Sequence, residues 1–256
     1  MAYIIKKLRA PIRATGFAGL TATALAALSI HERLAPPSES DALTDAYIRR
    51  WARSMLTIFG IKLNLHSPLP PPPRSARLIV SNHRSPVDIL VLVSLFGGSF
   101  LSRGDLAKWP LIGKAATKVK TIFVDRTNSA SGVQAIRAMR QRLKEKGTVI
   151  VFPEGTTFEG DEVRPFKPGA FLASHRMPCD LVPVGLAYEP GAEFKNESFM
   201  QYMARMSSAK SLRVDVCVGT PSLADDHAQD SALRFHDEVA ELVKKARSFA
   251  PPQPSR

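Results

Sequence analysis

The sequence predicts an α/β fold with a mostly parallel central sheet flanked by helices, preceded by N-terminal helices that associate with a membrane. Three observations predict it. Short runs rich in Val, Ile, Leu and Phe, bounded by turn residues, alternate with helix-like stretches beyond residue 75. The clearest helix, residues 130–146, lies between two such runs, so a right-handed parallel crossover is the default. An uncharged stretch at 14–30 follows a basic N-terminal arm.

A length of 256 residues suits one α/β domain with short appendages. We expect a membrane-associating helical segment at 1–66, a Pro-rich linker at 67–74, an α/β domain at 75–250 and a disordered tail at 251–256. The formal charge of +12 indicates an anionic partner, which leaves nucleic acid, an acidic lipid headgroup or a phosphorylated substrate. We interpret the two cysteines as core thiols, because two are too few for a disulfide framework or a zinc site.

Residues 14–30 are just long enough to be considered as a bilayer span, although Gly, Thr and Ala keep them only moderately apolar. A half-inserted helix and a cleaved signal peptide are the alternatives, and we favour retention of the segment. The positive-inside rule then keeps the basic arm in the cytoplasm. A single full span would put the domain outside, whereas a hairpin or a shallow insertion would not.

The next stretch, residues 41–59, is typical of an amphipathic helix. Its apolar side chains repeat at helical spacing: Ile48, Trp51, Ala52, Met55 and Phe59. The helix either lies on a bilayer or packs on the core of its own domain. Together with residues 14–30 it gives the double signal that stable membrane anchoring needs. The polyproline stretch "SPLPPPPR", residues 67–74, ends this unit.

Beyond the linker we expect six strands, from their apolar content and flanking turn residues. They lie near 77–81, 99–102, 121–124, 148–152, 181–188 and 212–219. The helix at 130–146 carries an apolar stripe and has Gly147 as its C-terminal stop. A last helix is expected at 228–248, before the Pro-rich tail.

Side chains that can act in catalysis or ligand binding follow three of these strands. His83 comes after the strand at 77–81, Arg126 after the strand at 121–124, and Glu154 after the strand at 148–152. Open α/β sheets bind ligands at the carboxyl ends of their strands. The pattern therefore favours one shared site at this edge of the sheet.

His83 and Asp88 need a turn between them, because five residues along a regular helix place two side chains roughly 140° apart. Ser85 as N-cap and Pro86 as the first helical residue supply the turn, with Asp88 at the third helical position. Asp88 would then accept the proton on one ring nitrogen and leave the other as a base.

Purely structural roles for Asp88 and His83 are also consistent with the sequence. Ser-x-x-Asp is a capping box, so Asp88 would only close the start of a helix, and His83 would be a hydrogen-bonded loop histidine. A metal site is a third interpretation, but one histidine and one carboxylate are too few ligands, and we expect no metal.

The segment "NHRSPVD", residues 82–88, resembles the H-x4-D motif of the glycerolipid acyltransferase family, which includes the bacterial 1-acyl-glycerol-3-phosphate acyltransferases. Three later segments are similar to further motifs in the family's order: "KTIFVDR" at 120–126, "VFPEGTT" at 151–157 and "LVPVGL" at 181–186. Residues 107–113 and 164–171 also read like connecting segments of the family, so the resemblance covers roughly residues 75–190.

The resemblance implies a division of roles. His83 is the general base that removes a proton from the acceptor hydroxyl, and Asp88 orients it. The alkoxide attacks an acyl thioester directly, so acyl-CoA or acyl carrier protein is a co-substrate and no cofactor is needed. Arg126 grips the acceptor's phosphate, and Glu154 contacts the acceptor or holds Arg126. The predicted substrate-binding set also includes Gly155, Thr156, Lys120 and Lys167.

Bland alternatives apply here too: Arg126 as a surface cation and residues 153–155 as a turn signal. The chain also departs from the family pattern, with Lys120 where glycine is usual, and with Thr157 and Phe158 where arginine or serine is frequent.

The expected activity is acylation of 1-acyl-sn-glycerol-3-phosphate to phosphatidic acid at the cytoplasmic face of a bacterial inner membrane. The alternatives are acylation of another lysolipid such as lyso-ornithine lipid, and a non-catalytic lipid-binding module. No nucleic-acid partner is expected, because no recognition motif accompanies the dispersed basic residues. Donor choice, chain-length preference and oligomeric state have no signal in the sequence.

Overall fold

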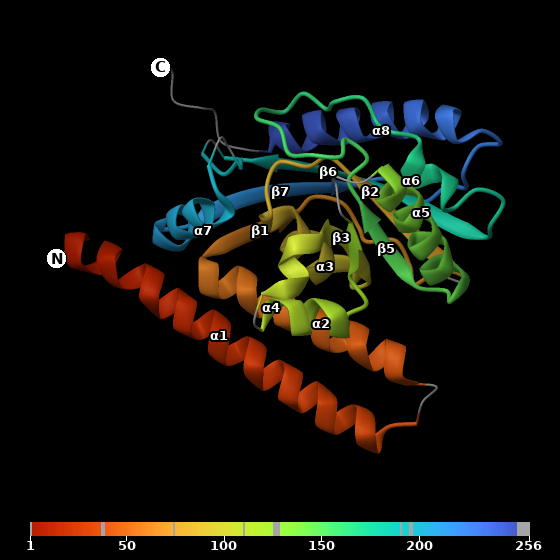
Figure 1. Cartoon of the computed structure of the whole chain (residues 1–256). Helices are drawn as coiled ribbons and strands as arrows, with labels where there is room; N and C mark the ends of the chain where they lie inside the picture. Colours follow the sequence, from red (N-terminus) through yellow and green to blue (C-terminus); the bar gives the residue numbers. More distant parts are fainter. Residues whose placement is uncertain are drawn as a thin grey trace.

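The computed structural model describes residues 2–36, 39–73, 75–109, 111–124, 129–189, 191–194 and 197–249. A seven-stranded sheet lies between two helical layers, with α8 above it and α2 and α3 below it in Figure 1. The strands are β1 (Ile61–Leu65), β2 (Ala76–Ser81), β3 (Ser99–Arg103), β4 (Ile122–Val124), β5 (Thr148–Val151), β6 (Cys179–Tyr188) and β7 (Leu212–Val218). The helices are α1 (Ala2–Leu34), α2 (Ser40–Phe59), α3 (Val87–Phe96), α4 (Ile112–Lys118), α5 (Ser129–Lys144), α6 (Gly169–Leu172), α7 (Phe199–Ser208) and α8 (Ala228–Ser248).

The strand order is β1-β7-β6-β2-β5-β3-β4, and every neighbouring pair is parallel except β6 with β7. The predicted mostly parallel α/β sheet is therefore confirmed. All six expected strands are present, as β2 to β7, and their bounds differ from the expected ones by no more than two residues. Because β2 pairs with both β5 and β6, the loops that leave these three strands meet at one edge of the sheet.

Two hydrophobic cores lie on the two faces of the sheet. Along β2, Ile79 contributes to the core under α2 and α3, whereas Leu78 and Val80 contribute to the core under α5 and α8. This alternation is the period of two that a strand imposes. All six residues of β2 are buried, as expected for a parallel strand covered by helices on both faces.

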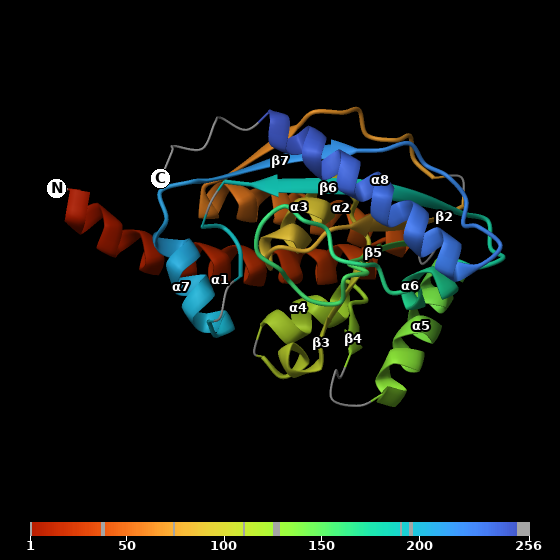
Figure 2. The ribbon, with the colours of Figure 1, turned by 90° about the horizontal axis from the view of Figure 1, so that it is seen from above.

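The segment at 40–65 is more closely joined to the sheet than the sequence suggested. Helix α2 buries Ile48, Met55 and Phe59 in the core, so its apolar stripe packs on its own domain. Gly60 then adopts a left-handed conformation, and the chain continues directly into β1, which pairs with β7. This edge strand was not predicted, because five alternating residues beside a helix end give a weak signal. The Pro-rich segment carries the chain from β1 across to β2 (Figure 2).

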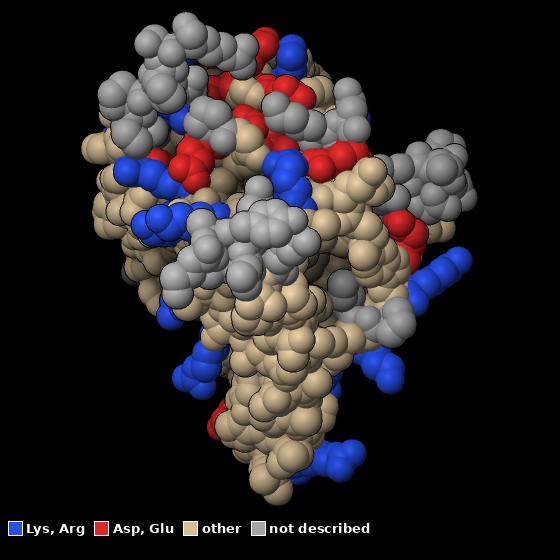
Figure 3. All heavy atoms as spheres, turned by 90° about the vertical axis from the view of Figure 1, so that its left-hand side faces the viewer, with Lys and Arg blue, Asp and Glu red and all other residues tan. Residues whose placement is uncertain are grey.

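Helix α1 is the one described helix that is long and apolar enough to cross a membrane, judged by length and composition over Leu8–Leu34. It is also attached to the domain. The Phe17 ring contacts the rings of Trp51 and Phe59 edge-on, and the Trp51 indole N–H donates a 3.1 Å hydrogen bond to Thr21. Its outer side leaves large apolar residues exposed: Leu8, Ile12, Ile30 and Leu34. Figure 3 shows a mainly uncharged surface over the lower part of this side, with Lys and Arg at its margins.

Arg13 fastens α1 to the C-terminal end of α7. Its guanidinium, 8% exposed, donates to the carbonyl oxygens of Met206, Ser207 and Ala209 at 3.3, 3.0 and 2.7 Å. The last carbonyls of a helix have no partner within the helix and carry partial negative charge, so a cation is favoured there. Arg13 therefore satisfies these carbonyls and fixes where α1 lies on the domain.

Replacing Arg13 should loosen this attachment. Arg13→Met removes a charged donor and leaves buried carbonyls without partners, so we expect the free energy of unfolding to fall by about 1.5–3 kcal/mol. Urea titration in detergent, followed by the fluorescence of Trp51 and Trp109, measures the change. Arg9→Met, one turn earlier on α1, is the control and should stay within about 0.5 kcal/mol of wild type. Equal losses of stability in the two variants would show that Arg13 does not hold α1 on α7.

Candidate active site

His83 and Asp88 meet where β2 gives way to α3. Helix α3 begins at Val87, one residue later than expected, because Pro86 stands at the N-cap position. The Ser85 hydroxyl still accepts a hydrogen bond from the Val87 N–H at 3.2 Å. The predicted turn is therefore present, and it folds His83 back over the first turn of the helix, where its Nδ1 lies 2.7 Å from the Asp88 carboxylate.

The Asp88 carboxylate is fully buried and gathers five donors, of which the Ser85 hydroxyl, 3.5 Å from Oδ1, is the most distant. Oδ2 accepts from His83 Nδ1 and from the backbone N–H groups of Arg84 and Ser85, at 2.7, 2.6 and 2.9 Å. Oδ1 accepts from the Tyr188 hydroxyl at 2.5 Å. The carboxylate thus holds His83 and the loop before α3. Because the N-cap residue is Pro86 and makes no side-chain cap, the predicted capping box with Ser85 at the N-cap is not formed.

Tyr188 is a site residue that the sequence analysis missed. It ends β6, and it reaches Asp88 because β6 is the neighbour of β2 in the sheet. Burial, together with the nearby Asp88 charge, raises the pKa of Tyr188 well above its usual value. The phenol is therefore a neutral donor to Asp88. Only the strand order could have identified it, since a tyrosine at the end of an apolar strand carries no motif of its own.

The imidazole of His83 is held on two sides. Its ring stacks on Phe152, with centroids 4.0 Å apart and planes 13° from parallel. The Nδ1–H group donates a hydrogen bond to Asp88, and Nε2 has no hydrogen-bond partner among the described residues. The side chain is 13% exposed, so this nitrogen is the part of the ring that a substrate can approach.

Glu154 lies beneath the His83 loop rather than at its surface. Its side chain is fully buried and pairs with Arg84 at 3.1 Å. The same carboxylate accepts the backbone N–H of His83 at 2.6 Å and that of Arg164 at 2.9 Å. Contact with the acceptor or with Arg126 stays a prediction, because the described partners of Glu154 are His83 and Arg84 in the loop after β2 and the backbone of Arg164.

Arg84 completes this support. Its Nε donates to the carbonyl of Gly160 at 2.5 Å and its Nη2 to that of Glu162 at 2.7 Å. The guanidinium is 2% exposed, so both members of the ion pair are out of water. A buried pair of this kind is costly to break, because the remaining partner becomes an uncompensated charge.

The other predicted substrate-binding residues divide into two groups. Gly155 has a φ of +80°, and a Cβ there would lie 2.7 Å from the ammonium of Lys167, so Lys167 passes beside Glu154's loop. Thr156 is exposed next to it. Lys120 precedes β4 and therefore lies at the amino edge of the sheet, opposite His83, where it pairs with Asp41. The structure does not bring Lys120 to the site.

Arg126 lies outside the described residues, so its predicted role stays a prediction. The described part of the chain contains no group of three or more His, Cys, Asp or Glu side chains that could hold a metal ion.

An apolar hollow adjoins the His83 loop. It has a volume of about 400 Å³, and its larger lining side chains are Leu106, Trp109, Phe194, Phe199 and Met200. The Phe194 N–H donates to the carbonyl of Arg84 at 2.9 Å, which connects one wall of the hollow to the loop. Asp105, Glu197 and Ser198 complete its lining. No local sequence pattern indicates the hollow, because its walls come from segments about 90 residues apart.

The family model described as Acyltransferase matches residues 62–187. A lyso-ornithine lipid O-acyltransferase from Brucella abortus is 33% identical over 144 residues, which are 55% of this chain and 52% of the relative. This chain thus spans about half the length of that relative. A second relative, the lyso-ornithine lipid O-acyltransferase of Pseudomonas aeruginosa, is 27% identical over 239 residues, which cover 87% of this chain and 89% of the relative.

The crystal structure of the 1-acyl-sn-glycerophosphate acyltransferase from Thermotoga maritima superposes with a TM-score of 0.79 at 17% identity, covering 98% of this chain and 100% of that one. It therefore has the same fold. The 1-acyl-sn-glycerol-3-phosphate acyltransferase of Neisseria meningitidis is 30% identical over 203 residues, which cover 75% of this chain and 77% of the relative. With a family match across the sheet and a relative aligned over most of its length, the chain belongs to the acyltransferase family.

Proposed function

We propose that this acyltransferase moves a fatty acyl group from an acyl thioester to the free hydroxyl of a lysolipid, with 1-acyl-sn-glycerol-3-phosphate as acceptor and phosphatidic acid as product. The observation that carries the proposal is the pair of His83 and Asp88, with Nδ1 bonded to the buried carboxylate and Nε2 open at the carboxyl edge of the sheet. Deprotonation of a hydroxyl requires a base with a free ring nitrogen, and Asp88 holds His83 in the tautomer that leaves Nε2 free.

The acyl group passes directly from the thioester to the acceptor, without an acyl-enzyme. His83 Nε2 takes the proton of the acceptor hydroxyl, and the resulting alkoxide attacks the thioester carbonyl. The carbon–sulfur bond breaks, and the departing thiolate receives a proton from the imidazolium. Asp88 stabilises the positive charge that His83 carries between the two proton transfers, because its carboxylate lies 2.7 Å from Nδ1.

Neither cysteine is suited to form an acyl-enzyme. Cys179 and Cys217 are both buried free thiols, as the sequence predicted. Burial raises the pKa of Cys179 to about 12 and also raises the pKa of Cys217, so neither supplies a thiolate near neutral pH. This supports attack by the acceptor itself.

The acceptor is proposed to place its phosphate near Arg126 and an acyl chain in the apolar hollow beside Arg84. The relative from Neisseria meningitidis is named for 1-acyl-sn-glycerol-3-phosphate, which favours the phosphate-bearing acceptor. Two relatives are named for lyso-ornithine lipid, and one of them aligns over 87% of this chain. Lyso-ornithine lipid is therefore the second candidate acceptor.

The proposed location is the cytoplasmic face of a bacterial inner membrane, where acyl-CoA and acyl carrier protein are available. Helix α1 supports it, because its outer side exposes Leu8, Ile12, Ile30 and Leu34 while its inner side packs on the domain. With Arg13 held on α7, the helix rests along the domain. We propose α1 as the membrane-associating part and the remaining described chain as the catalytic domain.

His83→Ala should lower kcat by about a hundredfold or more without loss of folding, since general-base catalysis contributes on the order of 10² to 10⁴. Initial rates with lysophosphatidate, together with thermal melting, measure both effects. His66→Ala is a matched control, because His66 also contacts a buried carboxylate, Asp215, at 2.7 Å, but follows β1, three places from β2 in the strand order, and stacks on Phe249. A His83 variant that melts early but keeps its rate per folded molecule would remove the catalytic role.

Glu154→Gln should mainly lower the stability of the fold. The substitution leaves the Arg84 guanidinium buried without its counter-charge, so we expect the free energy of unfolding to fall by about 3–5 kcal/mol. Urea titration measures it, and Glu162→Gln, whose side chain is 72% exposed, should change little. Unchanged stability with a raised KM for the acceptor would instead assign Glu154 to substrate binding.

The acceptor is decided by supplying lysophosphatidate and lyso-ornithine lipid with each acyl donor and identifying the products by mass spectrometry. If Arg126 clamps a phosphate with two hydrogen bonds, Arg126→Lys keeps the charge but loses the fork. The KM for lysophosphatidate should then rise roughly ten- to hundredfold while the donor KM stays constant. Preference of the wild type for lyso-ornithine lipid would reject the phosphate clamp.

A further inference from the structure

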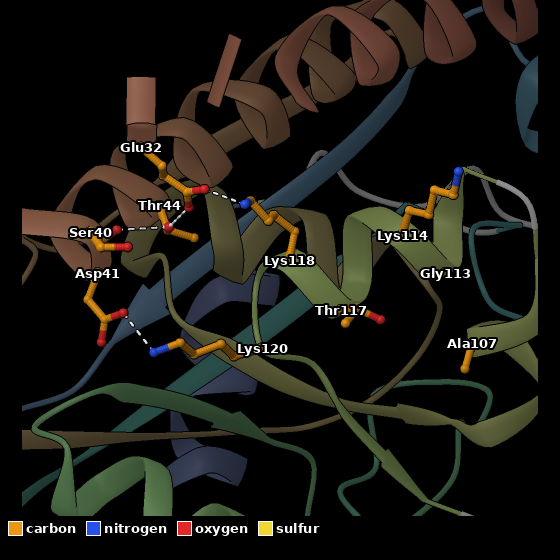
Figure 4. A pocket seen from close by; sticks show the side chains of 10 residues that line it. All are labelled: Glu32, Ser40, Asp41, Thr44, Ala107, Gly113, Lys114, Thr117, Lys118 and Lys120. Carbon is orange, nitrogen blue, oxygen red and sulfur yellow. Dashed lines mark hydrogen bonds and ion pairs between the residues drawn. The ribbon is translucent and has the colours of Figure 1, made fainter. Parts of the chain in front are cut away.

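A second hollow, of about 690 Å³, opens between helix α4 and the ends of α1 and α2 (Figure 4). One wall carries Glu32 and Asp41, and the other carries Lys114, Lys118 and Lys120. We call it the lysine groove. A Cβ at Gly113 would collide with the carbonyl oxygen of Ala107, so glycine at this position lets α4 pack against the preceding 3-10 helix, Gly104–Lys108, and shapes this wall.

The groove carries an excess of positive charge. Lys118 pairs with Glu32, and Lys120 pairs with Asp41 at 2.7 Å. Lys114 has no ion-pair partner among the described residues, and Figure 4 shows it extending from α4 without a bond to the other wall. Three lysines against two carboxylates leave one net positive charge.

The two ion pairs are partly exposed, which makes them exchangeable. The side chains of Lys118 and Lys120 are 34% and 48% exposed. Exposed pairs of this kind contribute little to stability, so an incoming anion can replace a carboxylate partner at small cost. The groove therefore offers a phosphate one free ammonium and two that can be recruited.

The helix that carries Glu32 also carries exposed apolar side chains. On α1, Ile30 and Leu34 are 60% and 79% exposed, and because each is two residues from Glu32 they project from the opposite side of the helix. A helix that rests in the interface of an anionic bilayer places its apolar side in the acyl region, and cations on its other side then lie near the phosphates.

We propose that the lysine groove binds the phosphate-bearing headgroup of an anionic phospholipid in the membrane on which α1 rests. Lys114 contacts the phosphate directly, and Lys118 and Lys120 exchange Glu32 and Asp41 for it. The site is separate from the catalytic one, because none of its lining residues belongs to the His83 or Glu154 loops and Lys120 lies at the opposite edge of the sheet.

The test is flotation of the full-length protein with phosphatidylcholine vesicles, with and without phosphatidylglycerol. Because a lysine near an anionic surface contributes about 1 kcal/mol, Lys114→Gln should weaken binding to the anionic vesicles about fivefold. The triple variant Lys114→Gln, Lys118→Gln, Lys120→Gln should weaken it by about tenfold or more. Binding to pure phosphatidylcholine should not change.

Two further variants distinguish binding at the lysine groove from general electrostatic attraction of the protein to an anionic surface. Lys62→Gln, Lys144→Gln, Lys244→Gln removes the same charge from exposed positions outside the groove and should weaken binding much less. Glu32→Gln, Asp41→Asn frees two groove lysines and should strengthen binding. Equal losses in the two triple variants, or no gain from the carboxylate variant, would overturn the proposal.

Competition with soluble phosphate compounds tests whether the groove binds a lipid headgroup or a free phosphate. Glycerol 3-phosphate or coenzyme A, added at the phosphate concentration of the vesicles, should leave the wild type bound. Release by either compound would show that the groove takes a soluble phosphate instead of a lipid and would overturn the proposal. Vesicle binding requires no turnover, so these outcomes are independent of whether the proposed acyl transfer is correct.

Discussion

The buried carboxylate of Asp88 is the group on which the site depends. It joins three parts of the fold, because it lies in the first turn of α3 and its donors come from the loop after β2 and from the end of β6. Five donors hold both oxygens in place, so His83 has one available tautomer and one available orientation. Because Asp88 is itself a residue of α3, the catalytic geometry and the first turn of the helix form together.

A second buried charge keeps the loop in place from below. The Arg84–Glu154 pair lies under the His83 loop, and Glu154 also binds the backbone N–H of His83. Desolvating two charges is costly, and the surrounding hydrogen bonds to backbone groups offset that cost. The result is a loop between β2 and α3 that is fixed from both sides, as a base acting within hydrogen-bond distance of its substrate requires.

The N-terminal helix connects this domain to its surroundings. On its inner side, Arg13 satisfies the carbonyls that end α7, and aromatic contacts join α1 to α2. On its outer side, exposed apolar residues remain for a bilayer. Because α7 also supplies one wall of the apolar hollow beside the His83 loop, the orientation of α1 and the position of that hollow are coupled through one helix.

The sequence by itself determined the strands β2 to β7, the helices at 130–146 and 228–248 and the pairing of His83 with Asp88, because local periodicity and a five-residue turn specify them. Only the tertiary structure decided the rest. Tyr188 reaches Asp88 because β6 is the neighbour of β2, and Glu154 binds Arg84 because β5 is the other neighbour. Lys120 is directed away because it precedes its strand instead of following it. Strand order brings Tyr188 to Asp88 from 100 positions away, and no local pattern encodes that order.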